Sequence, residues 1–349
     1  MNYFRKCVRE IEPYVPGLQL NDPEIIKLNT NENPYPPSEK VLSSLKNQIN
    51  ETLRLYPDPV SNELRDTIAK TYSLNRDNII VGNGSDEMLS LIFRAFVEPG
   101  DSTLFFYPTY TLYTVLAQAN SANIIQIQLD DLFNIPDQPF PKNCKLCCVP
   151  NPNVPSGNFI PHHVLKRLAN TIDGILVIDE AYVDFAEDNC LNLLKENDNI
   201  IITRTFSKSF SLAGMRIGYS IASPHIIDGL MSIKDSYNLN RLSAVAAKAA
   251  LDDIETIHLT IQKIKAVRSQ TAHELKKLGF DVLPSQTNFI FTRHPRIHSK
   301  DLYEKLLARK ILVRYFNQPR VNAYVRITIG TESEMETLIK TISQIMEKS

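Results

Sequence analysis

The sequence has no apolar stretch that approaches the roughly 18 uninterrupted residues that a membrane-spanning helix needs. It also has almost no net charge, since 38 basic residues face 39 acidic ones and leave a formal charge of −1. A global attraction to nucleic acid or to an anionic membrane surface is therefore not expected. The first residues, MNYFRKCVRE, become charged before an apolar run can form, so we expect no signal peptide and a cytosolic location.

A complete metal-binding pattern is missing as well. Cys144 and Cys147 have the C-x-x-C spacing of zinc and redox sites, but no second pair accompanies them. The surrounding KLCCVP is typical of a buried strand in which cysteine acts as a small hydrophobe. The seven histidines are scattered, and His162 and His163 are adjacent, so they cannot share one helical face. We expect no metal site.

What the chain does contain, between residues 76 and 206, is an alternation of two kinds of segment. Short β-branched runs, several of them continuously apolar, alternate with helix-like segments. Such runs are typical of strands that are buried on both faces, so we predict a mostly parallel sheet in an α/β domain. The predicted strands lie at 78–82, 102–106, 123–129, 144–150, 174–182 and 199–206.

The length of 349 residues exceeds that of one ordinary domain and predicts two. The texture changes near residue 240, where a helical stretch over 241–278 precedes shorter strands and helices. This second pattern is typical of a smaller α+β domain. The N-terminal segment is rich in Pro and Asn and is typical of an extended arm. We therefore predict an arm over 1–40, a large α/β domain over 41–240 and a small domain over 241–349.

Three polar segments follow predicted strands, where ligands bind in open α/β sheets. The most informative is TRTFSKSFSLAGMRIGY, which contains Lys208. A lysine that is buried beside other cations can act as a free amine or form a Schiff base. Thr205, Ser207 and Arg216 are suited to a phosphate group, and Gly214 would allow a close approach of the backbone.

The other two segments are VIDEAYVDF and VGNGSDEMLSLI. In the first, Asp179 ends a buried strand and Tyr182 follows; a buried carboxylate needs a cationic partner, such as a protonated ring nitrogen. In the second, Gly84, Ser85 and Asp86 begin a predicted helix, whose free N–H groups suit a phosphate. Taken alone, an Asp that caps a turn and a simple connecting turn remain alternatives.

Together these segments resemble pyridoxal-phosphate enzymes of fold type I, specifically class I and II aminotransferases of the histidinol-phosphate aminotransferase type. The resemblance extends from LNTNENPYPPS (28–38) to YVRITIGT (324–331). It implies a large domain with a mostly parallel sheet flanked by helices, a smaller α+β domain, and an N-terminal arm that contributes to the active site. It also implies that pyridoxal 5′-phosphate forms a Schiff base with Lys208, that Asp179 holds the ring nitrogen and that Tyr182 bonds the ring 3-oxygen.

The resemblance assigns three further positions. Tyr110 matches the aromatic residue that stacks on the cofactor ring. Tyr56 matches a tyrosine that reaches the cofactor phosphate of the neighbouring subunit, which implies a homodimer with a shared active site. Most relatives read N-P-x-N-P-x-G where this chain has NPNVPSG, so Val154 replaces the asparagine that bonds the ring oxygen. Either Asn153 takes over that role, or Tyr182 acts alone.

The resemblance also implies a substrate. Arg326 matches the family's carboxylate-binding arginine, and a bidentate arginine suits any amino-acid substrate. Arg314 and Tyr14 lie where histidinol-phosphate aminotransferases contact the substrate phosphate. The implied reaction converts L-histidinol phosphate and 2-oxoglutarate to imidazole acetol phosphate and L-glutamate in histidine biosynthesis, with ping-pong kinetics.

Other functions on the same fold remain as alternatives. An aromatic amino-acid aminotransferase and an L-threonine-O-3-phosphate decarboxylase share much of this framework. A regulatory module without catalysis is disfavoured, because the chain has no basic patch and combines Lys208, Asp179, Tyr182 and Arg216.

Overall fold

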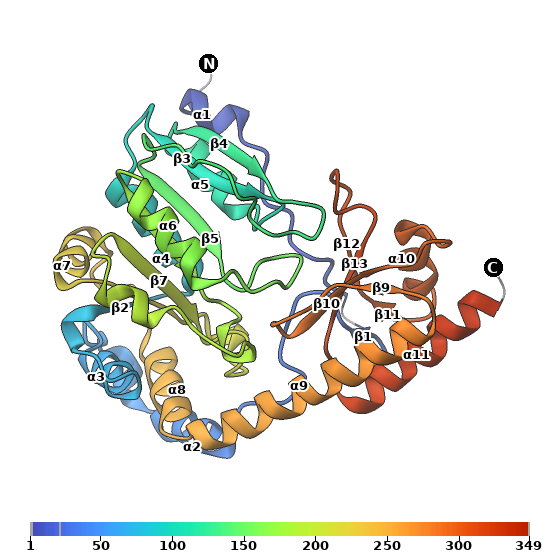
Figure 1. Ribbon diagram of the computed structural model, residues 1–349. Coiled ribbons are helices and arrows are strands. Elements are labelled where there is room, and N and C mark those ends of the chain that lie inside the picture. The colour runs from blue at the N-terminus through green and yellow to red at the C-terminus, as the bar shows by residue number, and fades with distance from the viewer. Residues whose placement is uncertain (1–2, 21, 348–349) are drawn as a thin grey trace.

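The computed structural model describes residues 3–20 and 22–347, and its larger domain is built on a seven-stranded sheet (Figure 1). All strands run in one direction except β8, which is antiparallel to both of its neighbours, β2 and β7. The predicted α/β class with a mostly parallel sheet is confirmed. In spatial order the strands are β2 (Ile79–Gly82), β8 (Gly218–Ile221), β7 (Ile200–Thr205), β6 (Ile175–Asp179), β5 (Leu146–Pro150), β3 (Ser102–Tyr107) and β4 (Asn123–Gln128).

Two hydrophobic cores cover the two faces of this sheet, because neighbouring residues of each strand point to opposite sides. Cys147 belongs to one core and Cys148 to the other, and both are completely buried. This agrees with the expectation that they act as small hydrophobes, and all five cysteines are free. One core contains residues of α4 (Ser85–Phe96), α5 (Leu112–Ala119) and α7 (Pro224–Ile233), and the other contains residues of α3 (Asn62–Thr71), α6 (His162–Thr171) and α8 (Arg241–Leu251).

The smaller domain contains a four-stranded antiparallel sheet in the order β12, β13, β10, β9. A strand of the N-terminal segment, β1, adds a parallel pair with β11 beside it. Its elements are β1 (Ile26–Lys27), β9 (Asp281–Val282), β10 (Phe289–Arg293), α10 (Ser299–Leu307), β11 (Ile311–Leu312), β12 (Arg314–Tyr315), β13 (Val325–Thr328) and α11 (Glu332–Glu347).

The helical stretch expected over 241–278 is two helices, α8 and α9 (Ile254–Lys277), separated at Asp252 and Asp253. α8 packs against α2 (Glu39–Gln48) and α3, beside the large sheet. α9 extends from there along the molecule and contacts α11, β9 and β10 of the small domain (Figure 1). By its contacts α8 thus lies with the large domain, and the exact domain limits stay a prediction.

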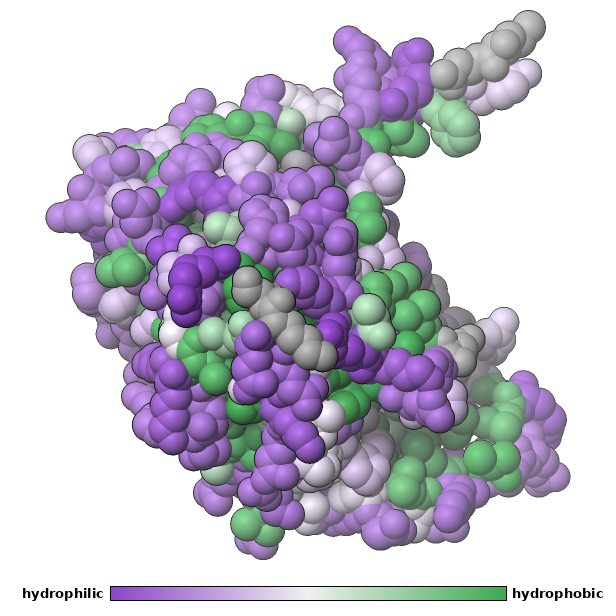
Figure 2. Space-filling model, turned by 90° about the vertical axis from the view of Figure 1, so that its right-hand side faces the viewer, coloured by the Kyte–Doolittle hydropathy of each residue, from purple (hydrophilic) through white to green (hydrophobic). Residues whose placement is uncertain are grey.

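The N-terminal segment passes between the two domains (Figure 1). It contains the short helix α1 (Lys6–Glu10), which packs on α5, and residues 11–20 have no regular structure. Figure 2 shows the small-domain side, where hydrophilic side chains cover most of the surface and hydrophobic ones form smaller patches. No helix within the two described ranges is both long and apolar enough to cross a membrane. The 3-10 helices are η1 (Glu51–Arg54), η2 (Arg76–Asn78), η3 (Val183–Phe185), η4 (Leu191–Lys195) and η5 (Ala213–Met215).

Candidate active site

A cavity of about 510 Å³ lies where the carboxyl ends of the large-domain strands, the small domain and residues 12–17 of the arm meet. Its position agrees with the rule that ligands bind beyond the carboxyl ends of strands in open α/β sheets. Of the residues predicted for the site, four do not line it, namely Gly84, Gly214, Asn153 and Tyr56. The predicted residues that do line it are Tyr14, Ser85, Asp86, Tyr110, Asp179, Tyr182, Thr205, Ser207, Lys208, Arg314, Arg326 and Arg216.

Lys208 lies in the loop after β7, half-buried, with its amine directed to the cavity. Its Nζ donates to the carbonyl oxygen of Thr30 at 3.3 Å and lies 5.7 Å from the ring centroid of Tyr182. Asn33 of the arm holds the backbone here, since its amide nitrogen donates to the carbonyl oxygens of Lys208 at 3.1 Å and Ser209 at 3.0 Å. Asn33 belongs to the segment LNTNENPYPPS, but no local pattern in that segment indicates this role.

Asp179 ends β6 and is buried. Its Oδ2 accepts a hydrogen bond from the Tyr113 hydroxyl at 2.8 Å, and its Oδ1 accepts one from the Ala181 amide at 3.2 Å. Burial raises the pKa of the Asp179 carboxyl to about 6, against the effect of the Tyr113 hydrogen bond. No residue in the described part of the chain forms an ion pair with it. The site thus presents a buried carboxylate that lacks a cation.

The hydroxyl of Tyr182 lies on the same side of the cavity and accepts a hydrogen bond from the Asn31 amide at 2.8 Å. Its ring packs edge-on against Phe289, with the centroids 5.3 Å apart. Asn31 has a positive φ of 58° and also accepts from Thr328 of β13 at 2.9 Å. The arm therefore connects Tyr182 to the small domain, a link that no local sequence pattern indicates.

Arg216 lies at one end of the cavity with the groups predicted to bind a phosphate. Its Nη2 pairs with Asp86 Oδ2 at 3.2 Å, and its Nη1 lies 3.5 Å from Ser207 Oγ. Thr205 Oγ1 donates to Ser207 Oγ at 3.0 Å. The N-terminus of α4 begins at Ser85 beside them, so free N–H groups, hydroxyls and a guanidinium converge, as an anion site requires.

Two glycines shape this end of the cavity, and neither is Gly214. A Cβ on Gly84, which has a φ of +89°, would lie 2.7 Å from Arg216 Nη2. A Cβ on Gly218 would lie 2.2 Å from the backbone nitrogen of Ser85. A Cβ on Gly214 would meet nothing within 4 Å, so the close contacts between segments of the chain lie at Gly84 and Gly218. A close approach of the Gly214 backbone to a phosphate stays a prediction.

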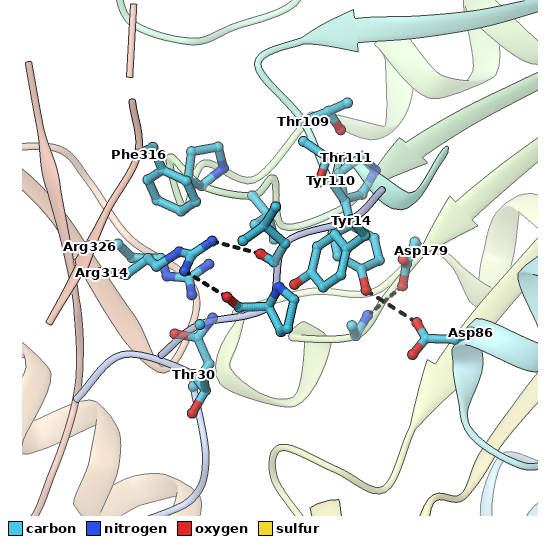
Figure 3. Close-up of a pocket in the computed structure, with 18 of the residues that line it drawn as sticks. Tyr14, Thr30, Asp86, Thr109, Tyr110, Thr111, Asp179, Arg314, Phe316 and Arg326 are labelled. Atoms are coloured by element: carbon cyan, nitrogen blue, oxygen red, sulfur yellow. Dashed lines mark hydrogen bonds between the residues drawn. The ribbon is translucent and has the colours of Figure 1, made fainter. Parts of the chain in front are cut away.

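Tyr110 and Tyr14 meet in the middle of the cavity (Figure 3). Their rings are edge-to-face, 5.6 Å between centroids, and the hydroxyl of Tyr110 donates to Asp86 Oδ1 at 3.3 Å. Burial is the main reason that the pKa of the Tyr14 hydroxyl is raised, so this group remains a hydrogen-bond donor. An aromatic wall and a donor hydroxyl thus separate the two charged ends of the site.

The small-domain end contains two arginines that lie directly opposite each other in the pairing of β12 with β13. Arg314 donates to the carbonyl oxygens of Val15 at 2.9 Å and Pro16 at 3.2 Å (Figure 3). Arg326 donates from Nη2 to the carbonyl oxygen of Asn29 at 2.9 Å, while its buried Nε has no partner among the described residues. Burial lowers the pKa of Arg326. Neither guanidinium is paired with a carboxylate within the described ranges, so an anion is the missing partner.

Asn153 and Tyr56 lie outside the cavity. The Asn153 amide donates to Ser156 Oγ at 2.9 Å inside the turn, whereas its neighbours Val154 and Pro155 line the cavity. Tyr56 is 76% exposed and stacks on Tyr237, with ring centroids 4.3 Å apart. Within one chain, therefore, neither residue reaches the position that the resemblance assigns to it.

The family model of class I and II aminotransferases matches residues 23–342 of this chain. The chain belongs to the class I and II aminotransferase family. Histidinol-phosphate aminotransferase from Microcystis aeruginosa is 43% identical to it over 342 residues, which cover 98% of each chain. Histidinol-phosphate aminotransferase from Clostridium beijerinckii is also 43% identical, over 352 residues that cover 99% of this chain and 98% of that one. The resemblance stated from the sequence is confirmed, and the protein is an aminotransferase.

A solved structure shows the same fold. Histidinol-phosphate aminotransferase from Sinorhizobium meliloti, in complex with pyridoxal 5′-phosphate, aligns with a TM-score of 0.88 at 24% identity. The alignment covers 100% of this chain and 98% of that one. The predicted fold type I architecture of this aminotransferase is thereby confirmed.

Proposed function

We propose that this aminotransferase uses pyridoxal 5′-phosphate to convert L-histidinol phosphate and 2-oxoglutarate to imidazole acetol phosphate and L-glutamate. The observation that carries the substrate is the pair Arg314 and Arg326. Two guanidiniums that lie opposite each other without a carboxylate repel, which costs stability unless an anion of high charge binds between them. A phosphate monoester is such an anion, and two arginine forks suit its oxygens.

The residues at the other end fit the cofactor. Asp179 is a buried carboxylate without a cation, and a protonated pyridine nitrogen would supply one. Arg216, Ser207, Thr205 and the start of α4 would hold the phosphate group. When bound, pyridoxal phosphate acts as an electron sink for the carbanion that forms at the substrate.

The reaction then depends on a few groups of the chain. Lys208 would attach the cofactor covalently and, once substrate has displaced it, move a proton from the substrate α-carbon as general base and return it as general acid. Asp179 would keep the ring nitrogen protonated by its charge. Tyr182, fixed by Asn31, would donate to the ring 3-oxygen, and with Asn153 turned into its own loop it would act there alone.

The second half-reaction would use the same arginines. 2-Oxoglutarate carries two carboxylates, so one would bind Arg326 and the other Arg314 in place of the phosphate. Because both substrates need this one site, they would bind in turn and give ping-pong kinetics.

The assembly that we propose is a homodimer whose partner completes each site. Tyr56 lies on the surface with other exposed apolar side chains, among them Leu53, Leu55 and Tyr237. Exposed apolar side chains that lie close together in the sequence, with Tyr56 stacked on Tyr237, are a feature that favours a protein interface here. In such a dimer the Tyr56 hydroxyl would reach the cofactor phosphate of the neighbouring subunit. A cytosolic location stays a prediction.

The experiment that tests the proposal is visible absorbance of the purified protein with pyridoxal phosphate, before and after addition of L-histidinol phosphate, with Lys208→Ala alongside. We expect an absorption band in the wild type that histidinol phosphate bleaches and that the variant does not form. A band that responds only to phenylalanine would replace our substrate with an aromatic one. Release of CO₂ from L-threonine-O-3-phosphate would indicate the decarboxylase, and no band at all would contradict the cofactor.

A further inference from the structure

The Asp179 carboxylate accepts a hydrogen bond from a side chain that lies far from it in the sequence, and this bond lowers its pKa more than its other hydrogen bonds do. Of its two donors, the Ala181 amide belongs to the same turn, at 3.2 Å from Oδ1. The Tyr113 hydroxyl comes from α5, 66 residues away in sequence, and lies 2.8 Å from Oδ2. The first turn of α5 thus fixes the carboxylate through Tyr113, which does not itself line the cavity. Tyr110, just before that turn, does line it.

The Tyr113 side chain is itself tightly packed. It is completely buried, and its ring packs 5.9 Å from Phe105 of β3 and edge-on at 5.6 Å from Tyr110. Burial, together with the neighbouring Asp179 charge, holds the pKa of Tyr113 well above its usual value. The phenol therefore keeps its proton at all working pH values and acts as a permanent donor.

The hydrogen bond also affects the charge of Asp179. Burial raises the pKa of that carboxyl, nearby Asp86 raises it further, and the Tyr113 hydrogen bond lowers it. Tyr110 on the loop and Cys148 on β5 are the other titratable groups that face it. Because neither is a cation, the Tyr113 hydroxyl is the main group that favours the ionised carboxylate before a ligand binds.

We propose that Tyr113 is a positioning residue, which holds the Asp179 carboxylate in the orientation and ionised form in which it pairs with the ring nitrogen of the cofactor. The inference rests on the proposed function, since it takes Asp179 to be the partner of that nitrogen. Tyr113 would touch neither cofactor nor substrate. Its effect would pass through one hydrogen bond, so a variant that keeps the ring and loses the hydroxyl isolates it.

Binding of pyridoxamine 5′-phosphate tests this proposal without reference to turnover. This ligand has no aldehyde and cannot bond covalently to Lys208, so its affinity reports the contacts of the ring nitrogen and the phosphate. We would measure its dissociation constant by equilibrium dialysis from acid to neutral pH for the wild type and for Tyr113→Phe. Tyr219→Phe is the matched control, because that tyrosine is 1% exposed and its hydroxyl donates to Tyr72 at 2.9 Å, away from the cavity.

For Tyr113→Phe we expect affinity at neutral pH to fall by roughly ten-fold or more, as for a lost hydrogen bond to a charged group. The midpoint of the loss of binding at acid pH should also move to higher pH. Tyr219→Phe should behave as the wild type. Equal affinity and midpoint in Tyr113→Phe, or an equal loss in Tyr219→Phe, would overturn the proposal.

A double-mutant cycle distinguishes an effect through Asp179 from a general loosening of α5. In an Asp179→Asn background, replacement of Tyr113 by Phe should leave the remaining affinity for pyridoxamine phosphate unchanged within about two-fold. A further loss of the same size as in the wild type would contradict the proposal. A wild type that does not bind pyridoxamine phosphate at all would instead overturn the proposed function, and this inference with it.

Discussion

At the scale of single residues, the arginine pair raises the question of what holds two like charges together. Phe316 directly follows β12, and its ring centroid is 5.2 Å from the guanidinium carbon of Arg314 and 5.4 Å from that of Arg326. Both cations therefore share one aromatic ring (Figure 3). Cation–π attraction offsets part of their repulsion.

Replacement of Phe316 by Leu would remove this ring while keeping an apolar side chain. We expect the KM for L-histidinol phosphate to rise roughly five- to thirty-fold, as for the loss of two cation–π contacts of modest strength. The kcat should change much less, because the Phe316 ring contacts the two arginines that bind substrate, whereas the chemical step depends on Lys208. Steady-state kinetics would show this split, and a fall in kcat at unchanged KM would refute the role of Phe316.

Asp179 gives a second prediction at this scale. Its pKa rises from 3.8 in the unfolded chain to about 6 in the fold. Between these values the folded protein holds a proton that the unfolded chain has released, so the free energy of unfolding falls as the pH rises through this window. Above pH 6 to 7 the carboxylate is a full destabilising charge in the cofactor-free protein.

Asp179→Asn should therefore stabilise the cofactor-free protein by about 1–3 kcal/mol at pH 8, with a gain that shrinks toward pH 5. Urea unfolding at several pH values measures the difference. Asp281→Asn serves as a control, because that carboxylate is largely exposed and pairs with Arg293 at 3.1 Å. A stability difference that is constant across the pH range would contradict the assignment. Activity should be lost in the stabilised variant, which is typical of functional groups held at a cost.

At the scale of elements, the arm fixes the lysine loop. Asn33 donates to two successive carbonyl oxygens there, and its own Oδ1 accepts from the Tyr35 amide at 3.0 Å. The first two bonds join the arm near residue 30 to the loop after β7, and the third orients the Asn33 side chain within the arm. The loop geometry around Lys208 is therefore a property of the arm as much as of the loop.

Asn33→Ala should free this loop. We expect faster hydrogen exchange of the backbone amides over 207–210, and a loss of stability of about 1–2 kcal/mol from the unpaired carbonyl groups. Asn158→Ala is a fair comparison, because its amide also donates to a backbone carbonyl, that of Leu132 at 2.8 Å, and neither residue lines the cavity. Unchanged hydrogen exchange over 207–210 in Asn33→Ala would show that the loop keeps its structure without the arm.

The elements also show how much could be predicted from the sequence. The short β-branched runs, several of them continuously apolar, located all six predicted strands of the large sheet, because strands leave a local signal in the sequence. β8 was missed, since its four residues, GYSI, mix polar and apolar side chains and its first two residues are the end of the lysine segment. Asn33, Asn31 and Tyr113 were missed for another reason. Their roles depend on contacts between distant segments, which no spacing along the chain records.

At the scale of the whole molecule, the site is divided among three parts of the chain. Lys208 and Asp179 belong to the large domain, Arg314 and Arg326 to the small one, and Tyr14 to the arm. A substrate that reaches from one charged end to the other must bridge both domains. Its affinity therefore depends on their relative position as well as on each contact, and binding should favour the arrangement in which the ends are correctly spaced.

Tyr56 extends this division to a second subunit. If its hydroxyl serves the neighbouring site, then each site combines Lys208 of one subunit with Tyr56 of the other. Tyr56→Ala and Lys208→Ala therefore damage the site from different subunits. Each variant alone should be nearly inactive, but a mixed dimer has one site with both defects and one with neither. Unfolding and refolding the two variants together should thus restore about a quarter of the wild-type activity, since half of the dimers are mixed and half of their sites are intact. Refolding each variant alone is the control. If the mixture stays inactive although mixed dimers are isolated through different affinity tags, Tyr56 acts within its own chain or not at all.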